Sequence, residues 1–317
     1  MEVRRSVLFM AINNPRFLRG AARHNCDGVI LDLEDAVAEP HKEYARTLPR
    51  EAYSEVSRGG AMVQIRINHM PWQADLDGAV WPGLSVIHYP KTEYAEEIRR
   101  LDQRITELER QRGIRPGTIE IHAAVETVRG VTNAYEIATA SPRIRTFGGG
   151  GMGFDNCRDL AIETLPGVVR TLEHYGIGET GLVARALGLR CTNGVRQGTG
   201  VTGDVISGDT AFDEASANRR AGLYAGLTCL HPNRVDGINR GYTPTPEEVQ
   251  QARDILARFE ELDGQGEVSG DLNGQPIDRW EAARARKLMA WSEAIARRER
   301  EKAAAKAGLA ASEKPAS

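Results

Sequence analysis

The sequence predicts an α/β fold, a (β/α)8 TIM barrel followed by a C-terminal helical lid extension, and three observations support this prediction. Short apolar runs end abruptly in charged or polar residues, as in Gly28–Val37, which ends in carboxylates. Such runs are typical of buried parallel strands that bring polar groups to one rim. Helix-like segments separate the runs, and 317 residues suit one barrel. No G-x-G-x-x-G pattern opens a helix after the first strand, which disfavours an open doubly wound sheet.

Eight segments have the composition of strands. The second stops at Glu34 and Asp35, the third at Arg66 and Asn68, and the eighth at His231. The seventh is the best candidate within a glycine-rich stretch. In chain order the expected strands are 6–12, 28–35, 61–68, 84–91, 119–127, 143–147, 189–195 and 226–232.

Helices are expected between several of these strands, over 15–23, 39–57, 94–112 and 129–139. Proline at position 15 starts the first, since it is tolerated in a first turn. Gly59-Gly60 ends the second. The third has acidic residues early and basic residues late, as the helix dipole favours.

The segment after the barrel has the pattern of a helical extension. Thr245, Pro246 and Glu248 form a capped start for a helix that ends near Leu262. A glycine-rich loop over 263–276 leads to a second helix, 278–298. We therefore expect a barrel over 1–240, a helical lid over 241–300 and a disordered tail over 301–317.

Composition excludes several classes of function. The formal net charge of −3 and the isoelectric point near 6.2 argue against nucleic-acid and membrane-surface partners, which require a basic surplus. The four cysteines form no C-x-x-C pair, which indicates reduced thiols rather than a zinc site or a disulfide framework. The pattern contains neither a signal peptide nor a transmembrane segment, so a cytoplasmic protein is expected.

Charged and polar residues at the ends of several expected strands should meet at one rim, because reactive groups in such barrels lie where strands end. Carboxylates gathered there need a cation, and oxygen ligands suit Mg²⁺. Arg66 would place a fixed positive group beside the metal. The rim candidates are Glu34, Asp35, Arg66, Asn68, Lys91, Glu126 and His231.

Several motifs, in order along the chain, resemble the citrate lyase beta subunit-like family, which includes malyl-CoA and citramalyl-CoA lyases. The resemblance implies a (β/α)8 barrel, a lid that acts on a neighbouring subunit, a homotrimer or hexamer, and Mg²⁺-dependent chemistry at a carbon–carbon bond next to a thioester. Mn²⁺ is an alternative metal. The motifs are Asn13-Asn14-Pro15-Arg16, Asp32-Leu-Glu-Asp-Ala-Val37, Ile65-Arg-Ile-Asn68, Tyr89-Pro-Lys91, Glu126-Thr-Val-Arg-Gly130, His231-Pro232 and Tyr242-Thr-Pro-Thr-Pro-Glu-Glu-Val249.

The resemblance also implies residue roles. Glu126 would bind the metal and the substrate, and Glu34 and Asp35 would hold metal-bound water. Arg66 would contact the thioester or keto oxygen and, because a guanidinium keeps its proton, would stabilise an enolate. Asp278 would reach the adjacent active site as a general acid or base, although Pro276 stands where the family usually has methionine.

Cofactor and loop contacts complete this set of expectations. Arg16 and Lys91 would contact coenzyme A, although Arg16 also fits a solvated helix residue. After the sixth strand this chain has Gly148-Gly-Gly-Gly-Met-Gly-Phe-Asp155 in place of the family's shorter acidic motif. Asp155 is the expected second metal ligand, with Asp159 or no acid as the alternatives, and the backbone of Gly150 and Gly151 would bind the substrate carboxylate.

Three functions fit these residues. The first is a Mg²⁺-dependent lyase that cleaves or forms a hydroxyacyl-CoA thioester with a 2-keto acid such as glyoxylate or pyruvate. The second is an acyl-CoA thioesterase or a free 2-keto acid aldolase that uses the same site. The third is a non-catalytic paralogue that binds a ligand, which the altered glycine-rich loop suggests.

Overall fold

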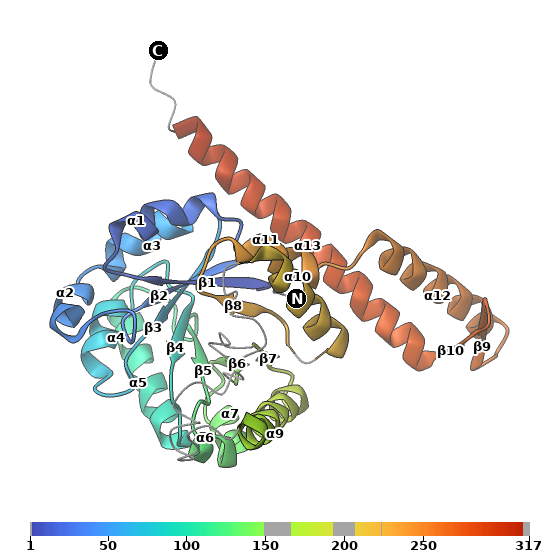
Figure 1. The fold of residues 1–317 in the computed structure, drawn as a ribbon, viewed down its shortest axis with the longest axis horizontal. Helices are drawn as coiled ribbons and strands as arrows, with labels where there is room; N and C mark the ends of the chain where they lie inside the picture. Colours follow the sequence, from blue (N-terminus) through green and yellow to red (C-terminus); the bar gives the residue numbers. More distant parts are fainter. Residues whose placement is uncertain (1, 149–165, 193–206, 223, 313–317) are drawn as a thin grey trace.

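The computed structural model describes residues 2–148, 166–192, 207–222 and 224–312, with side chains left out at 166–174 and 310–312. Eight parallel strands form one curled sheet in the order β7-β6-β5-β4-β3-β2-β1-β8 (Figure 1). The Ala225 N–H donates to the Cys191 carbonyl at 2.8 Å, which links the chain before β8 to β7. The expected TIM-barrel-like fold is therefore confirmed. The strands are β1 (Ser6–Ala11), β2 (Gly28–Asp32), β3 (Met62–Arg66), β4 (Val86–Tyr89), β5 (Glu120–Ala123), β6 (Ile144–Phe147), β7 (Arg190–Cys191) and β8 (Leu227–Cys229).

Helices cover the outside of this sheet (Figure 1). Two of them, α9 (Pro166–Ala186) and α10 (Gly208–Ala221), were not predicted, and glycines within α9 obscure its helical period. No helix among the described residues is long and apolar enough to cross a membrane. The remaining barrel helices are α1 (Pro15–Gly20), η1 (Ala21–Arg23), η2 (Glu39–His41), α2 (Lys42–Ala45), α3 (Pro49–Ser57), α4 (Gln73–Ala79), α5 (Ala95–Gln111), α6 (Val128–Thr132), α7 (Ala134–Ala138) and α11 (Arg234–Tyr242).

The register of the strands separates an apolar outer face from a polar inner ring. Leu31, Ile65 and Ile87 are fully buried in the core between sheet and helices. Alternate residues point the other way. Five consecutive strand pairs place one inner ring in register, which contains Ala11, Asp32, Arg66, His88, His122 and Thr146.

Two segments that were each predicted as one continuous helix are divided into shorter helices. The segment 39–57 divides into η2, α2 and α3, because Pro49 cannot continue a preceding helix and starts a new one. The segment 129–139 divides into α6 and α7 at Asn133.

The C-terminal extension consists of α12 (Pro246–Gly264), the antiparallel hairpin β9 (Ser269–Leu272) and β10 (Gln275–Asp278), and α13 (Arg279–Ser312). The predicted cap of α12 is confirmed, since Thr245 and Glu248 bond reciprocally to each other's backbone N–H groups. Figure 1 shows the hairpin at the end of α12 and α13 that is far from the barrel strands.

The expected disordered tail is wrong over 301–312, where α13 continues as a helix. Lys302 is 1% exposed, and its Nζ donates to Asp27 Oδ1 at 2.7 Å and to the Asn25 carbonyl at 2.9 Å. A composition rich in alanine, lysine and glutamate does not reveal this buried ion pair, since the partner lies near the other end of the chain. Residues 313–317 lie outside the described part.

Candidate functional site

Arg66 is the best-held charged side chain of the inner ring. It ends β3, and Asp32 ends the neighbouring β2, so the register brings the two together. Arg66 Nε and Nη2 donate to the two oxygens of Asp32 at 2.7 and 2.6 Å. Burial alone would lower the pKa of Arg66, but the hydrogen bonds and charge of Asp32, together with Glu34 and Glu126, raise it. The guanidinium is therefore fixed in position and permanently charged.

Asp32 is a residue of this site that was not among the predicted rim residues. It is 1% exposed and also accepts hydrogen bonds from the backbone N–H groups of Glu34 and Ala36. Its position two residues after Ile30, on the inner face of β2, was the available signal. Glu34 and Asp35, which follow shortly after it, were the acids predicted at the end of this strand.

Glu34 and Lys91 extend the cluster across the mouth of the barrel. Glu34 is 5% exposed and pairs with Arg66 Nη1 at 2.8 Å and with Lys91 Nζ at 3.0 Å. Asp35 is exposed, 3.6 Å from Arg66 Nη1. Lys91 has a φ of +51°, a left-handed conformation that costs a lysine about 1–2 kcal/mol. This conformation accompanies a backbone N–H that faces Glu126 and an ammonium group that reaches Glu34.

Glu126 lies on the same mouth, three residues after β5 ends. Its Oε2 accepts a hydrogen bond from the Lys91 N–H at 3.3 Å. Burial raises the pKa of Glu126 to about 7, and the Glu34 charge adds to this, while Arg66 and Lys91 act in the opposite direction. The expectation that Glu126 and Arg66 share one rim agrees with this geometry.

The residues that follow Glu126 explain the rest of its motif. Thr127 caps α6, because its hydroxyl accepts a hydrogen bond from the Gly130 N–H at 3.0 Å. A β-carbon at Gly130 would lie 2.3 Å from the Thr92 carbonyl oxygen, so only glycine fits there. In this motif, Glu126 is the acid at the mouth, and Thr127 and Gly130 form the turn that follows it.

Other rim candidates have structural roles. Asn68 is buried, and its side chain donates to Asp75 at 2.6 Å and to the Leu33 carbonyl at 3.0 Å. His231 accepts a hydrogen bond from the Asn233 N–H at 3.3 Å, as a turn residue does. The side-chain amide of Asn68 is therefore used by Asp75 and by the Leu33 carbonyl, next to Glu34 at the predicted rim.

None of the hydrogen bonds and ion pairs given for the described residues joins Arg16 or Asp278 to the cluster. Arg16 is an exposed residue of α1, after the end of β1. Asp278 accepts hydrogen bonds from the N–H groups of Trp280 and Glu281 at 2.7 and 3.0 Å, which caps α13. Its hairpin projects away from the barrel of its own chain (Figure 1). Gly150, Gly151, Asp155 and Asp159 lie outside the described residues.

The donor set fits a divalent metal ion. The carboxylates of Asp32, Glu34, Asp35 and Glu126 face two basic side chains, those of Arg66 and Lys91, which leaves two negative charges in the cluster once Glu126 is ionised. Oxygen-only donors with room for water suit Mg²⁺. Within the described residues no three such side chains converge closely enough to hold a metal by themselves, so a further ligand is needed.

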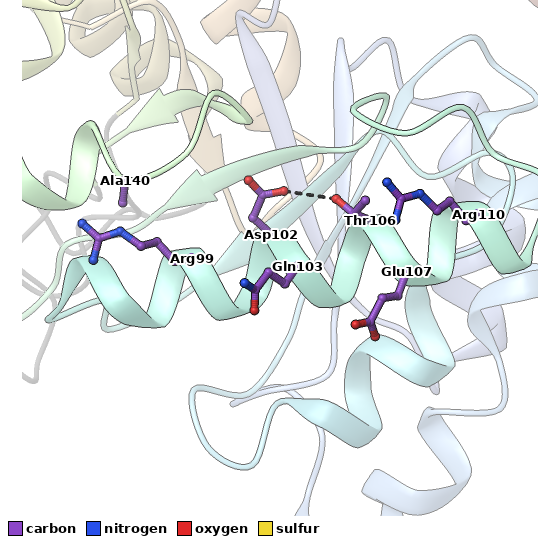
Figure 2. Close-up of a pocket in the computed structure, with 7 residues that line it drawn as sticks. All are labelled: Arg99, Asp102, Gln103, Thr106, Glu107, Arg110 and Ala140. Atoms are coloured by element: carbon purple, nitrogen blue, oxygen red, sulfur yellow. Dashed lines mark hydrogen bonds between the residues drawn. The ribbon is translucent and has the colours of Figure 1, made fainter.

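A depression on the outside of the barrel is not part of this site. Figure 2 shows that its lining comes from α5 and from one residue after α7, with a hydrogen bond of 3.3 Å between Thr106 and Asp102. Its exposed charged residues lie along the outer helix layer rather than at the strand ends. The lining residues are Arg99, Asp102, Gln103, Thr106, Glu107, Arg110 and Ala140.

Comparisons with known proteins agree with the geometry of the mouth. The family model described as HpcH/HpaI aldolase/citrate lyase matches residues 5–191. The citrate lyase subunit beta of Leuconostoc mesenteroides is 30% identical over 91% of this chain and 93% of its own length. The (3S)-malyl-CoA thioesterase and an L-malyl-CoA/beta-methylmalyl-CoA lyase of Cereibacter sphaeroides are also 30% identical, over 92% and 86% of this chain and 95% and 90% of their own lengths.

Solved structures give the same fold. A citrate lyase from Burkholderia xenovorans has a TM-score of 0.76 at 18% identity, over 93% of this chain and 92% of that one. The citrate lyase beta subunit of Mycobacterium tuberculosis, solved with oxaloacetate and magnesium, has a TM-score of 0.57 at 25% identity, over 75% of this chain and 96% of that one.

Proposed function

Because the chain belongs to the HpcH/HpaI aldolase/citrate lyase family of carbon–carbon lyases, we propose that it is a Mg²⁺-dependent enzyme that acts on CoA thioesters. The reaction is the cleavage or formation of a hydroxyacyl-CoA of the malyl-CoA or citramalyl-CoA type, with a 2-keto acid such as glyoxylate or pyruvate as the other partner. Support comes from the 30% identical malyl-CoA lyase and from the magnesium and oxaloacetate in the M. tuberculosis structure.

The observation that carries this proposal is the fixed Arg66 guanidinium beside Glu126. In cleavage, a base, for which Asp278 of a neighbouring subunit is the candidate, takes the hydroxyl proton, and the carbon that bore the hydroxyl becomes the carbonyl of the 2-keto acid. The electron pair of the broken carbon–carbon bond passes to the thioester as an enolate, which then takes up a proton to give the acyl-CoA. Arg66 keeps its proton and is held by Asp32, so it can stabilise the enolate oxygen without reorganising. A donor removed from such a position costs about 10²–10³ in rate.

The metal would be bound by Glu126 and by a second acid, for which Asp155 and Asp159 are the candidates. When bound, it supplies a Lewis acid that orients and polarises the 2-keto acid. Glu34 and Asp35 would hold water at this site, and Mn²⁺ is an alternative to Mg²⁺. Lys91 and Arg16 would bind coenzyme A, and backbone N–H groups of Gly150 and Gly151 would bind the substrate carboxylate.

The assembly we propose is a homotrimer or hexamer in which Asp278 of one subunit completes the site of the next. One feature supports this: Asp278 lies on a hairpin that projects from its own barrel (Figure 1). Neither nucleic acid nor a membrane is an expected partner.

The test is synthesis by the purified protein with Mg²⁺, acetyl-CoA or propionyl-CoA, and glyoxylate or pyruvate. A hydroxyacyl-CoA product, detected by mass spectrometry and abolished by a chelator, is expected. If metal is present and none of these pairs gives a product, the lyase proposal is wrong.

A second candidate is an acyl-CoA thioesterase, which the 30% identical (3S)-malyl-CoA thioesterase favours. Release of free CoA from malyl-CoA, without glyoxylate, would identify this activity. A free 2-keto acid aldolase would cleave its substrate with no CoA present. Binding of a keto acid with no turnover at all would identify a non-catalytic paralogue.

A further inference from the structure

Two buried histidines in the barrel take no part in the proposed reaction. His88 on β4 and His122 on β5 are partners in the parallel register, 6% and 5% exposed. Their ring centroids are 4.3 Å apart at an interplanar angle of 53°. His88 is also the register partner of Arg66, so the pair adjoins the guanidinium in the inner ring.

The His88 ring has unused hydrogen-bonding groups. Within the described part of the chain neither Nδ1 nor Nε2 of His88 has a hydrogen-bond partner. A buried polar group left in this way costs about 1–3 kcal/mol, and native proteins rarely contain one without a reason. Such a group is explained by a catalytic role or by a bound water, ion or ligand.

His122 is oriented by the backbone. Its Nε2 lies 2.8 Å from the Gly148 carbonyl oxygen, which can only accept, so Nε2 carries the proton. In the neutral ring Nδ1 is then an acceptor. This bond fixes the position of the Gly148 carbonyl beside the pair.

Both rings are uncharged. Burial lowers the pKa of His122 to about 4, and burial together with the neighbouring His122 and Arg66 lowers the pKa of His88 well below its ordinary value. A neutral imidazole offers one donor and one acceptor. A hydroxyl group can satisfy both, whereas a carboxylate can only accept.

The histidine pair lies between the Arg66 layer of the barrel interior and a layer of ion pairs below it. The ring of Phe9 lies between His88 and Arg66. Its centroid is 6.1 Å from the centroid of the His88 ring and 4.9 Å from the Arg66 guanidinium carbon. Phe9 is partly exposed, so solvent reaches the inner ring at this residue. One layer further down, Glu120 pairs with Arg4 at 2.7 Å and with Arg190 at 2.8 Å, which closes the interior below the histidines.

We propose that His88 and His122 form the floor of the substrate pocket and bind a hydroxyl group of the 2-keto acid. They would then determine specificity by favouring keto acids that carry a hydroxyl beyond the keto group. The inference rests on the proposed function, because it takes the keto acid to bind beside Arg66.

The test compares pyruvate with hydroxypyruvate, which differ by one hydroxyl group. Affinities of the Mg²⁺-loaded protein for both are measured by calorimetry, and kcat/KM for both with acetyl-CoA. The wild-type protein is expected to prefer hydroxypyruvate by about tenfold or more. His88→Leu should reduce this preference to about one, and His88→Gln should retain part of it.

Ile87→Val is the matched control, because Ile87 is the adjacent residue of β4 and faces the core on the opposite side. It should leave the preference unchanged. His88→Leu removes an unpaired polar group and should fold, which its thermal unfolding midpoint verifies; His88→Met replaces it if it does not fold. An unchanged preference in the leucine or methionine variant, or no preference in the wild type, would overturn the inference.

Failure of this inference can be told from failure of the proposed function. Turnover of pyruvate and hydroxypyruvate at equal efficiency would contradict the hydroxyl subsite alone. A clear preference in binding affinity, lost in His88→Leu, with no turnover of any CoA substrate would contradict the lyase proposal and leave the subsite intact. Equal affinities in every variant would mean that the histidines bind a structural water only, and that the inference is wrong.

Discussion

At the scale of single residues, Asp32 explains why Arg66 can act as a fixed positive group. The carboxylate is 1% exposed and takes two hydrogen bonds from one edge of the guanidinium, while Nη1 stays directed to Glu34. Paired hydrogen bonds of this kind hold orientation as well as charge. Asp32 is therefore a positioning residue, and Arg66 is the group we expect to contact the substrate.

Replacing Arg66 tests that division of roles. Arg66→Lys keeps the positive charge but loses the planar fork, so kcat should fall by about 10²–10³ while the fold is kept. Steady-state kinetics and circular dichroism measure the two effects. Arg99→Lys is the matched control, since Arg99 is exposed on α5 and pairs with the exposed Glu96 (Figure 2). Equal losses in both variants would contradict a specific role for Arg66.

Glu126 allows a separate test of the metal site. Glu126→Gln keeps the shape of the side chain but removes its charge, so we expect Mg²⁺ to bind at least about tenfold more weakly. Calorimetric titration of the metal-free protein with Mg²⁺ measures this. Glu107→Gln, a change to an exposed acid on α5, should bind Mg²⁺ as the wild type does. Unchanged affinity in Glu126→Gln would remove it from the ligand set.

At the scale of elements, α13 is attached to the barrel by a buried ionic cluster. Asp27, which precedes β2, is fully buried and pairs with Arg5 at 2.8 Å and Lys302 at 2.7 Å. Arg298, on the same helix, donates to the carbonyls of Asp27 and Gly60 at 2.8 and 2.6 Å. The last turns of the helix therefore contribute to the fold of the barrel, rather than fraying as the composition suggested.

Asp27→Asn should lower the free energy of unfolding by about 3–5 kcal/mol at pH 7, because it leaves two buried cations without their partner. Urea denaturation measures this value. Glu301→Gln removes an exposed acid paired with Arg298 on α13 and should change it by less than about 1 kcal/mol. An equal effect in the two variants would contradict the assigned importance of the buried cluster.

The effect of Asp27→Asn should depend on pH. Burial alone would raise the pKa of Asp27, but its bonds to Arg5, followed by the attraction of Arg5 and Lys302, lower it below the ordinary value near 3.8. A carboxyl whose folded pKa is lowered stabilises the fold fully above its unfolded pKa, and this contribution is lost as pH falls through the folded value. The difference between wild type and variant should therefore shrink below about pH 4. A constant difference down to pH 3 would count against this explanation.

At the scale of the whole molecule, the site and the lid of one chain do not meet. Arg66 and Glu126 lie at the mouth of the barrel, whereas Asp278 lies in the projecting hairpin (Figure 1). In the cyclic assembly that we propose, each hairpin would reach the next barrel and so bring the two parts together. Trp280, 62% exposed beside Asp278, gives the hairpin an apolar residue for that contact.

Mixed assemblies test whether Asp278 acts on a neighbour. Arg66→Lys and Asp278→Asn variants, each nearly inactive alone, are co-expressed with different tags, and assemblies that carry both tags are purified. In a trimer of the two variants about one site in three combines an intact Arg66 with an intact Asp278, so about a third of wild-type activity should return. If Asp278 acts within its own chain, the mixed assemblies will be no more active than the parents. Assemblies of Arg66→Lys with two tags serve as the control.

Much of the candidate site followed from local pattern. Glu34, Arg66, Lys91 and Glu126 were all predicted at one rim, because each follows an apolar run and parallel strands end on the same side. Asn68 was predicted at the same rim, but its partners Asp75 and the Leu33 carbonyl were not, because composition carries no sign of them.

The sequence by itself determined the alternation of strands and helices, and with it the barrel and the ends of strands that bear charge. These are local properties, since a run of apolar residues and the break that follows lie within a few residues of each other. Only the tertiary structure decided that Asp32 holds Arg66, that His88 meets His122, and that Lys302 reaches Asp27. Lys302 and Asp27 are 275 positions apart in the sequence. Contacts of this kind depend on strand register and barrel closure, which no local pattern contains.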